Sequence, residues 1–183
     1  MPVRDRLLNA AEQVVAKEGV TGLTLDAVAK HAGVSKGGLL YHFPTKSALI
    51  VAVVERLACQ CGADQDRAAA GTAEATPGAF TRAYVAARSE HEPDPQEMPI
   101  HTALLAAAGT DPQYLEPFRR RHVEWQKRLE QDGIDPVIAT IVRLAMDGMC
   151  LGSLLGMPVP QGELRRAVID RLVKMTEPQQ QQP

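Results

Sequence analysis

The first twenty residues place apolar side chains at the spacing of an amphipathic helix. These positions recur three or four residues apart, which keeps them on one face of a helix, and they are Val3, Leu7, Leu8, Ala11, Val14 and Val15. Glycine tolerates the left-handed conformation that often ends a helix. Gly19 therefore predicts the end of a helix over residues 3–18.

A short second helix is predicted over residues 24–31. Thr24 is a favourable N-cap, and Asp26 puts negative charge in the first turn, where it complements the helix dipole. Gly33 follows the last apolar position and predicts the end of this helix.

A third helix over 36–43 begins at the N-cap Ser35 and stops at Pro44, because the residue before a proline avoids the helical region. Beyond the proline, Thr45 caps a fourth helix. Its apolar positions predict that it covers residues 46–61 and bridges to the rest of the chain.

The remaining sequence predicts five more helices and no strand. The helices are expected over 79–89, 100–108, 110–131, 137–156 and 162–175. Turn-forming residues separate them at 71–78 and 92–99, and the glutamine-rich tail over 177–183 is predicted to be disordered. The fold is therefore expected to be all-α, with about nine helices.

The composition agrees with a helical protein, and its charge is unevenly distributed. The chain has 183 residues, of which 45% are apolar and only 4% aromatic, and this favours helices over sheets. The formal net charge is −2. Residues 1–58 hold seven Lys/Arg against five Asp/Glu, or +2, which leaves −4 for the remainder. A basic head on an acidic body is suited to approach a polyanion with the head.

Cysteine usage and hydropathy predict a cytoplasmic protein without a membrane partner. Three cysteines are too few and too irregular for a disulfide framework, and Cys-x-Cys lacks the spacing of a zinc site; they are Cys59, Cys61 and Cys150. The N-terminus does not resemble a signal peptide. The most apolar stretch, 137–157, contains Arg143 and Asp147, which favours a buried bundle helix over a membrane span.

The second and third predicted helices, with the glycine turn between them, form a helix-turn-helix. In such motifs the second helix enters the major groove of DNA. Glycine inside a helix costs roughly 1 kcal/mol relative to alanine, yet Gly37 and Gly38 lie in the first turn of this helix. Backbone N–H groups are unpaired there, so the missing side chains let this helix end approach a phosphate closely.

Polar side chains around the same helix have the chemistry for DNA contacts. Lysines attract phosphate, and the hydroxyl and imidazole groups hydrogen-bond to phosphate or bases. The predicted DNA-binding residues are Thr24, Ser35, Lys36, Gly37, Gly38, Tyr41, His42 and Lys46. Whether bases are read by Leu40, Tyr41 or His42 stays open at this point.

Residues 3–50, and above all the segment TLDAVAKHAGVSKGGLLYHFPTKSAL, resemble the TetR family of transcriptional regulators. This chain has Leu40 where the family usually has its first tyrosine. Residues 111–160 look like one C-terminal subtype of the family. The resemblance implies a homodimeric repressor that binds a palindromic double-stranded operator and is released by a small-molecule effector of unknown identity.

The resemblance also implies a division of the chain. It assigns 1–50 to a helix-turn-helix DNA-binding head, 51–176 to a helical ligand-binding and dimerisation domain and 177–183 to the tail. Helices 136–157 and 162–175 would form the dimer interface. Glycines recur there every four residues, at Gly148, Gly152 and Gly156, and this pattern fits either an internal packing seam or the dimer seam.

Candidate ligand contacts in the second domain are apolar or sulfur-containing side chains, which suit small-molecule pockets but equally fit a plain core. They are Met98, Leu104, Trp125, Met146 and Cys150. Arg143 and Asp147 lie four residues apart and are expected either to pair with each other or to face the pocket or the dimer seam.

Two alternatives to a ligand-released repressor remain. One is an activator, or another DNA binder, without a small-molecule effector. The other is an all-α small-molecule-binding protein or enzyme with a vestigial helix-turn-helix. The sequence has no nucleophile–base–acid set, phosphate-binding glycine loop or metal-ligand spacing, so neither catalysis nor a cofactor is expected.

Overall fold

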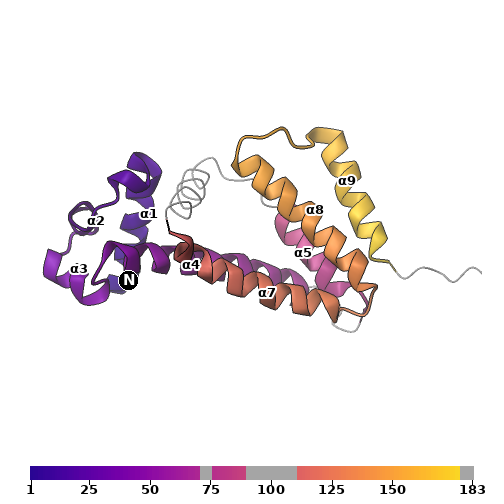
Figure 1. Cartoon of the computed structure of the whole chain (residues 1–183), viewed down its shortest axis with the longest axis horizontal. Coiled ribbons are helices and arrows are strands. Elements are labelled where there is room, and N and C mark those ends of the chain that lie inside the picture. Colours follow the sequence, from indigo (N-terminus) through magenta and orange to yellow (C-terminus); the bar gives the residue numbers. More distant parts are fainter. Residues whose placement is uncertain (71–75, 90–110, 178–183) are drawn as a thin grey trace, which may run out of the picture. The chain divides into compact units, whose positions relative to one another are not determined.

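The computed structural model describes residues 1–70, 76–89 and 111–177, and the protein is all-α within them (Figure 1). The elements are α1 (Val3–Gly22), α2 (Leu25–Ala32), α3 (Lys36–His42), α4 (Lys46–Ala70), α5 (Ala79–Ser89), the 3-10 helix η1 (Pro112–Leu115), α7 (Glu116–Glu130), α8 (Pro136–Leu154) and α9 (Gly162–Met175). The prediction of an all-α fold is thus confirmed.

The described residues divide into two compact units. Unit 1 comprises residues 1–59 and 111–120, and unit 2 comprises residues 60–70, 76–89 and 121–177. The helices α4 and α7 each contribute residues to both units.

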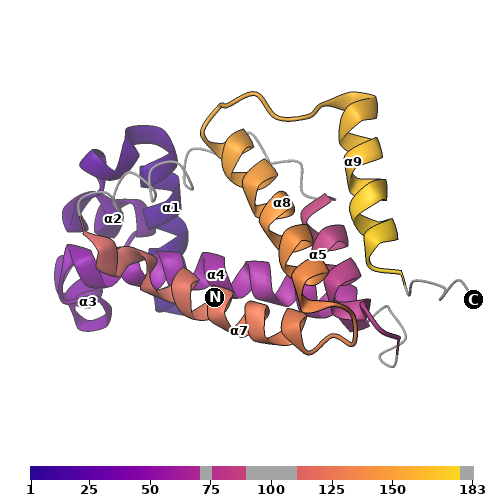
Figure 2. The same cartoon turned by 45° about the vertical axis from the view of Figure 1, so that its right-hand side comes forward.

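Unit 1 has its own core, built from the apolar faces of the first four helices. Figure 2 shows α1, α2 and α3 gathered beside the first turns of α4. Its most buried large side chains are Leu7, Leu8, Val15, Leu23, Val28, Leu39, Leu49 and Ile50. Tyr114 and Phe118 pack against this core from the segment that follows residue 110.

Unit 2 has a second core in which α5 packs against both α8 and α9 (Figure 1). The buried side chains come from four helices and include Phe80, Tyr84, Trp125, Leu129, Val142, Met146 and Leu172. This core positions the side chains of the polar cluster described below.

Several helix boundaries differ from the sequence prediction. Gly19 has φ 70° and ψ −179°, so it interrupts α1 where an end was predicted, although helical turns continue to Gly22. The fourth helix extends to Ala70 instead of ending near residue 61. The single helix predicted over 110–131 begins with the 3-10 turn η1, because Asp111 caps that turn through the amide of Gln113 at 3.1 Å.

Other predictions lie partly or wholly outside the described residues. The helix over 100–108 and the break at 92–99 lie wholly outside them, as do residues 71–75 of the break at 71–78 and residues 178–183 of the tail over 177–183.

Among the described residues, α8 is the one helix that is long and apolar enough to cross a membrane; α3 and the first part of α4 pass the same test only if they count together as one bent span. Such evidence is weak, because the core helix of a soluble domain has the same length and composition. In α8, Ala139, Val142 and Met146 are buried in the core of unit 2.

Candidate nucleic-acid interface and a buried polar cluster

The turn between α2 and α3 is held by local caps and by one arginine. Thr24 Oγ1 accepts a hydrogen bond from the amide of Ala27 at 3.1 Å, so Thr24 is the predicted N-cap of α2. Gly33 has φ 63° and ψ 40°, a left-handed conformation that favours glycine. Arg6 Nη2 donates to the carbonyls of Ala32 at 2.6 Å and Gly33 at 3.2 Å, which fixes the turn against α1.

The candidate recognition helix α3 is fixed by its cap and by two apolar anchors. Ser35 Oγ accepts a hydrogen bond from the amide of Gly38 at 3.1 Å, as the sequence predicted. Leu39 and Phe43 are buried in the core of unit 1. One side of α3 is therefore held by packing, while residues on its other side are exposed.

The two glycines of α3 have different surroundings. A Cβ atom added to Gly37 would meet no heavy atom within 4 Å, whereas one added to Gly38 would lie 3.3 Å from Ser35 Oγ. Lack of space within the chain therefore explains in part why residue 38 is glycine, but it does not explain why residue 37 is glycine. A glycine with open space in front of it is consistent with close approach by another molecule.

Gly37, Leu40 and Tyr41 lie on one face of α3 by helical spacing, and that face is exposed. The side chain of Tyr41 is 85% exposed, and that of Leu40 is 38% exposed. His42 is half-buried and meets the Tyr41 ring edge-on at a centroid distance of 5.2 Å. This geometry favours Leu40 and Tyr41 over His42 for contacts with bases.

The two candidate lysines lie at helix starts. Lys36 Nζ pairs with Asp26 at 3.0 Å, and both side chains are largely exposed, so the pair can open at little energetic cost. Lys46 begins α4 directly after Thr45, whose Oγ1 accepts from the amide of Ala48 at 3.0 Å. Together the eight predicted residues occupy the N-caps of α2 and α3, the helix α3 itself and the start of α4.

The three pocket candidates that the structure describes differ in burial. Trp125 and Met146 are buried in the core of unit 2, whereas Cys150 is exposed on α8. Met98 and Leu104 lie outside the described residues. The pocket assignment as a whole thus stays a prediction.

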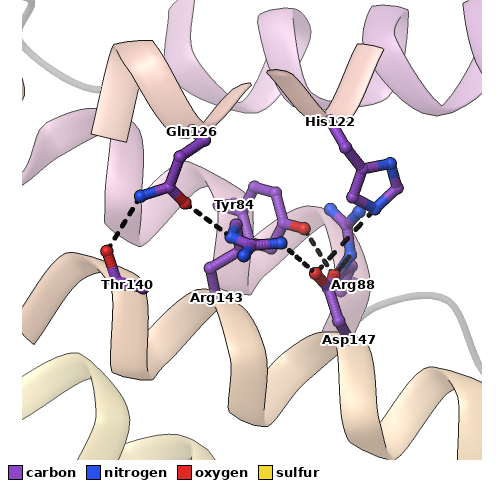
Figure 3. Close-up of polar contacts among 7 residues, drawn as sticks. All are labelled: Tyr84, Arg88, His122, Gln126, Thr140, Arg143 and Asp147. Atoms are coloured by element: carbon purple, nitrogen blue, oxygen red, sulfur yellow. Dashed lines mark hydrogen bonds and ion pairs between the residues drawn. The ribbon is translucent and has the colours of Figure 1, made fainter. Parts of the chain in front are cut away.

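Instead, unit 2 contains a polar cluster around the carboxylate of Asp147 (Figure 3). Tyr84 Oη donates to Asp147 Oδ1 at 2.5 Å, and Arg143 Nη1 donates to Oδ2 at 2.9 Å. Arg88 Nε lies 3.3 Å from Oδ1, and His122 Nε2 lies 3.8 Å from Oδ2. The pairing of Arg143 with Asp147 confirms one of the predicted alternatives.

Further contacts orient the two arginines. Arg143 Nε donates to Gln126 Oε1 at 2.8 Å, and Gln126 Nε2 donates to Thr140 Oγ1 at 2.9 Å (Figure 3). The Arg88 guanidinium lies over the ring of Tyr84, 3.7 Å from its centroid, and 5.0 Å from that of Trp125. Arg143 is thus held by hydrogen bonds and Arg88 mainly by ring faces.

The environment of Tyr84 changes its acidity. Burial of the hydroxyl raises its pKa far above the usual value; the charge of Arg88 opposes the rise, and the charge and hydrogen bond of Asp147 add to it. Tyr84 is therefore protonated at any physiological pH and acts as a hydrogen-bond donor toward Asp147.

Sequence reasoning found only one pair of this cluster. Arg143 and Asp147 are neighbours on a helix face, but Tyr84 lies 63 residues before Asp147 and carried no local signal. Among the described residues, no group of three or more His, Cys, Asp or Glu side chains could hold a metal ion.

One face of α8 is apolar and uncovered in the described chain. Its side chains are between 44% and 62% exposed and are Val137, Ile141, Leu144 and Leu151 on the helix and Leu155 at its C-cap; with Gly148 they recur at alternating spacings of four and three residues. Gly148 continues the same pattern, and an added Cβ there would meet no heavy atom within 4 Å. Alternating spacings of this kind are typical of a helix that packs along another helix.

The other two glycines of the four-residue repeat have different roles. At Gly152, an added Cβ would lie 2.5 Å from Val159 Cγ1, so this glycine packs within unit 2. Gly156 has φ 67° and lies just beyond the end of α8. The three glycines therefore do not form one seam.

Comparison with family models gives two matches along the chain. Residues 7–53 match the model for bacterial regulatory proteins of the tetR family, and residues 78–177 match the model for a tetracyclin repressor-like C-terminal domain. The second match alone covers more than half of the 183 residues.

Individual proteins show the same likeness. The HTH-type transcriptional regulator UidR of Escherichia coli K12 is 28% identical over 125 residues, which are 67% of this chain and 60% of that protein. The chain thus matches less than two thirds of the length of that relative. A TetR family member, SCO1917 from Streptomyces coelicolor A3, is 29% identical with a TM-score of 0.68, covering 94% of this chain and 98% of the other. The multidrug binding protein EbrR complexed with ethidium is 29% identical with a TM-score of 0.66, covering 93% and 97%.

Proposed function

The chain belongs to the tetR family of bacterial regulatory proteins, and on that premise we propose that it is a cytoplasmic, homodimeric repressor that a small-molecule ligand releases from a palindromic operator. In this proposal α3 enters the major groove. The two copies of α3 would read half-sites about one DNA turn apart (~34 Å).

The observation that carries the proposal is the exposed face of α3. Leu39 and Phe43 anchor one side of the helix, and the other side presents Tyr41 beside a glycine with open space in front of it. The dipole of α4 and Lys46 at its start would add a phosphate contact beyond the motif.

The role of Gly37 can be tested by separating DNA affinity from stability. Gly37→Ala should leave the unfolding free energy unchanged or slightly higher, because alanine favours helix and its Cβ has room. Affinity for DNA from upstream of the gene should nevertheless fall, and Gly37→Glu should abolish it, since its carboxylate would face phosphate. Anisotropy titrations of labelled duplexes measure both effects. If Gly37→Glu bound DNA as tightly as the parent chain does, α3 would not be part of the DNA interface.

Lys46 offers a second, independent test. Lys46→Ala should weaken binding to all DNA sequences alike. It should also reduce the slope of log affinity against log salt concentration by about one, because one fewer counterion is released. Lys127→Ala, which removes an exposed lysine from α7, is the control and should change neither quantity. Equal salt slopes for Lys46→Ala and Lys127→Ala would contradict a phosphate contact at Lys46.

The homodimer is supported by the uncovered apolar face of α8. A second copy of the chain would cover Leu144 and Leu151, and Gly148 between them would allow close helix approach. Leu144→Glu combined with Leu151→Glu should convert the dimer into monomers in sedimentation velocity runs. Val123→Glu, which changes an exposed apolar residue on α7, should remain dimeric. A double variant that still sediments as a dimer would place the interface elsewhere.

Release by a ligand is supported by the comparison with EbrR, whose structures hold imidazole, malachite green or ethidium. Because α4 contributes residues to both units of this chain, we propose that ligand binding in unit 2 shifts α4 and thereby lowers operator affinity. Coupling of this kind is typically ~1–3 kcal/mol. A compound that stabilises the chain against heat yet leaves operator affinity unchanged would contradict it.

A further inference from the structure

We propose that the Asp147 cluster in unit 2 binds the carboxylate of a small organic effector, and that Arg88 is the residue that contacts it. The inference rests on the proposed ligand response and specifies the chemical class of the ligand.

Among the described residues, the guanidinium and carboxylate charges of the cluster are unbalanced. Two guanidinium groups, of Arg88 and Arg143, face the one carboxylate of Asp147, so these three groups have a net charge of +1. These side chains are only 15%, 16% and 22% exposed, respectively. An uncompensated charge in such surroundings is unfavourable, and a bound anion would remove the imbalance.

The two arginines differ in how far their hydrogen-bonding capacity is used. Arg143 donates to both Gln126 and Asp147. Arg88 has one ion pair among the described residues, a 3.3 Å contact between Nε and Asp147, while its planar face lies over the Tyr84 ring. Guanidinium donors point outward in the plane of the group, so stacking holds Arg88 in place without using them.

A balanced arginine in the same unit shows what is unusual about Arg88. Arg128 also lies over an aromatic ring, 3.8 Å from the centroid of Phe80, but it pairs one-to-one with Asp66 at 2.6 Å. Arg88 shares its only described carboxylate partner with Arg143, which makes the shorter contact, and it therefore has donors to offer to a ligand.

The charge also indicates which anion fits. A monoanion neutralises a net charge of +1, whereas a dianion such as hydrogen phosphate would overcompensate it and would be repelled by Asp147 more strongly than a monoanion. The planar fork of an arginine matches the two oxygens of a carboxylate. An organic monocarboxylate is therefore favoured over phosphate.

The test uses the full-length chain with matched pairs of small monocarboxylates and their primary amides, for example benzoate with benzamide and octanoate with octanamide. Thermal melts find the binders, and calorimetric titration gives Kd. At about ten times Kd, a carboxylate should raise Tm by about 3–6 °C while its amide has no effect. Amides that bind as well as their acids, or a panel without a binding carboxylate, would overturn the inference.

Three variants assign the contact, and two of them shift affinity in opposite directions. Arg88→Gln should weaken carboxylate binding about tenfold or more, because a charged hydrogen bond is lost. Asp147→Asn should strengthen it, because the competing carboxylate is gone. Arg128→Gln is the control and should bind like the parent chain. A general loss of folding cannot produce stronger binding by Asp147→Asn, so weaker binding by this variant would refute the site.

Failure of the carboxylate site can be distinguished from failure of the proposed repressor function. If ethidium or an amide binds and releases operator DNA while no carboxylate does, the inference fails and the ligand-released repressor stands. If the chain binds no operator DNA in any condition, the proposed function fails whether or not carboxylates bind.

Discussion

Asp132 joins the end of α7 to the start of α5, and its substitution tests how unit 2 is held together. Its Oδ1 accepts from the amide of Phe80 at 3.0 Å, and its Oδ2 accepts from the amide of Thr81 at 2.7 Å and from Thr81 Oγ1 at 2.6 Å. One carboxylate thus caps a helix that begins 53 residues earlier in the chain, and Thr81 is completely buried.

Asp132→Ala should lower the unfolding free energy by about 2–4 kcal/mol. Loss of a helix cap typically costs about 1 kcal/mol. The buried Thr81 hydroxyl, left without its acceptor, adds about 1–3 kcal/mol. In a chain of this size the combined loss should lower Tm by roughly 10 °C, measured by circular dichroism.

Asp135→Ala is the matched control for this prediction. Asp135 caps α8 through the single amide of Val137 at 2.8 Å and is exposed, so its loss should cost only about 1 kcal/mol. If Asp132→Ala destabilises the chain no more than Asp135→Ala does, the carboxylate is not a tertiary link and the reasoning is wrong.

Three further predictions concern pH and backbone or charge contacts. Burial raises the pKa of Tyr84, so the folded chain holds this proton more tightly than the unfolded chain, and stability falls as pH rises above about 10. In urea titrations, Tyr84→Phe should make the unfolding free energy fall less steeply with pH, by a slope that corresponds to at most one proton. An unchanged slope would contradict the prediction. Gly33→Ala should lower stability by about 1–2 kcal/mol, because Gly33 has φ 63°; a neutral result in chemical denaturation would show that the turn can relax. Glu12→Gln should cost about 1 kcal/mol, because its half-buried pair with Arg56 at 2.5 Å is still partly screened by solvent; a more stable variant in the same assay would show that the pair is unfavourable.

Much of the candidate interface was predictable because its determinants are local. The N-cap side chains of Thr24 and Ser35 bond to amides three residues ahead, so a short stretch of sequence contains both partners. The turn at Gly33 and the stop at Pro44 likewise depend on the backbone preferences of single residues. The helix-turn-helix could therefore be located from the sequence with boundaries close to those observed.

The length of α4 was not predictable from the same signals. Its apolar pattern weakens after residue 61, yet the helix continues to Ala70. Gly62 follows directly, but a single glycine can lie inside a helix, and the alanine-rich sequence after it is compatible with either state, so the pattern alone could not place the end of the helix.

Pairs of residues that lie far apart in the chain were decided by the tertiary structure. From the sequence, Asp132 is part of a loop; only the tertiary structure shows that its carboxylate accepts hydrogen bonds from α5. Arg143 and Asp147 read as an isolated pair on a helix until Tyr84 and Arg88 approach them from α5. The periodicity of a sequence shows which face of a helix is apolar, but it does not show which helix covers that face. For this reason the sequence was sufficient to locate the candidate recognition helix, whereas only the packed bundle placed two guanidinium groups against one carboxylate.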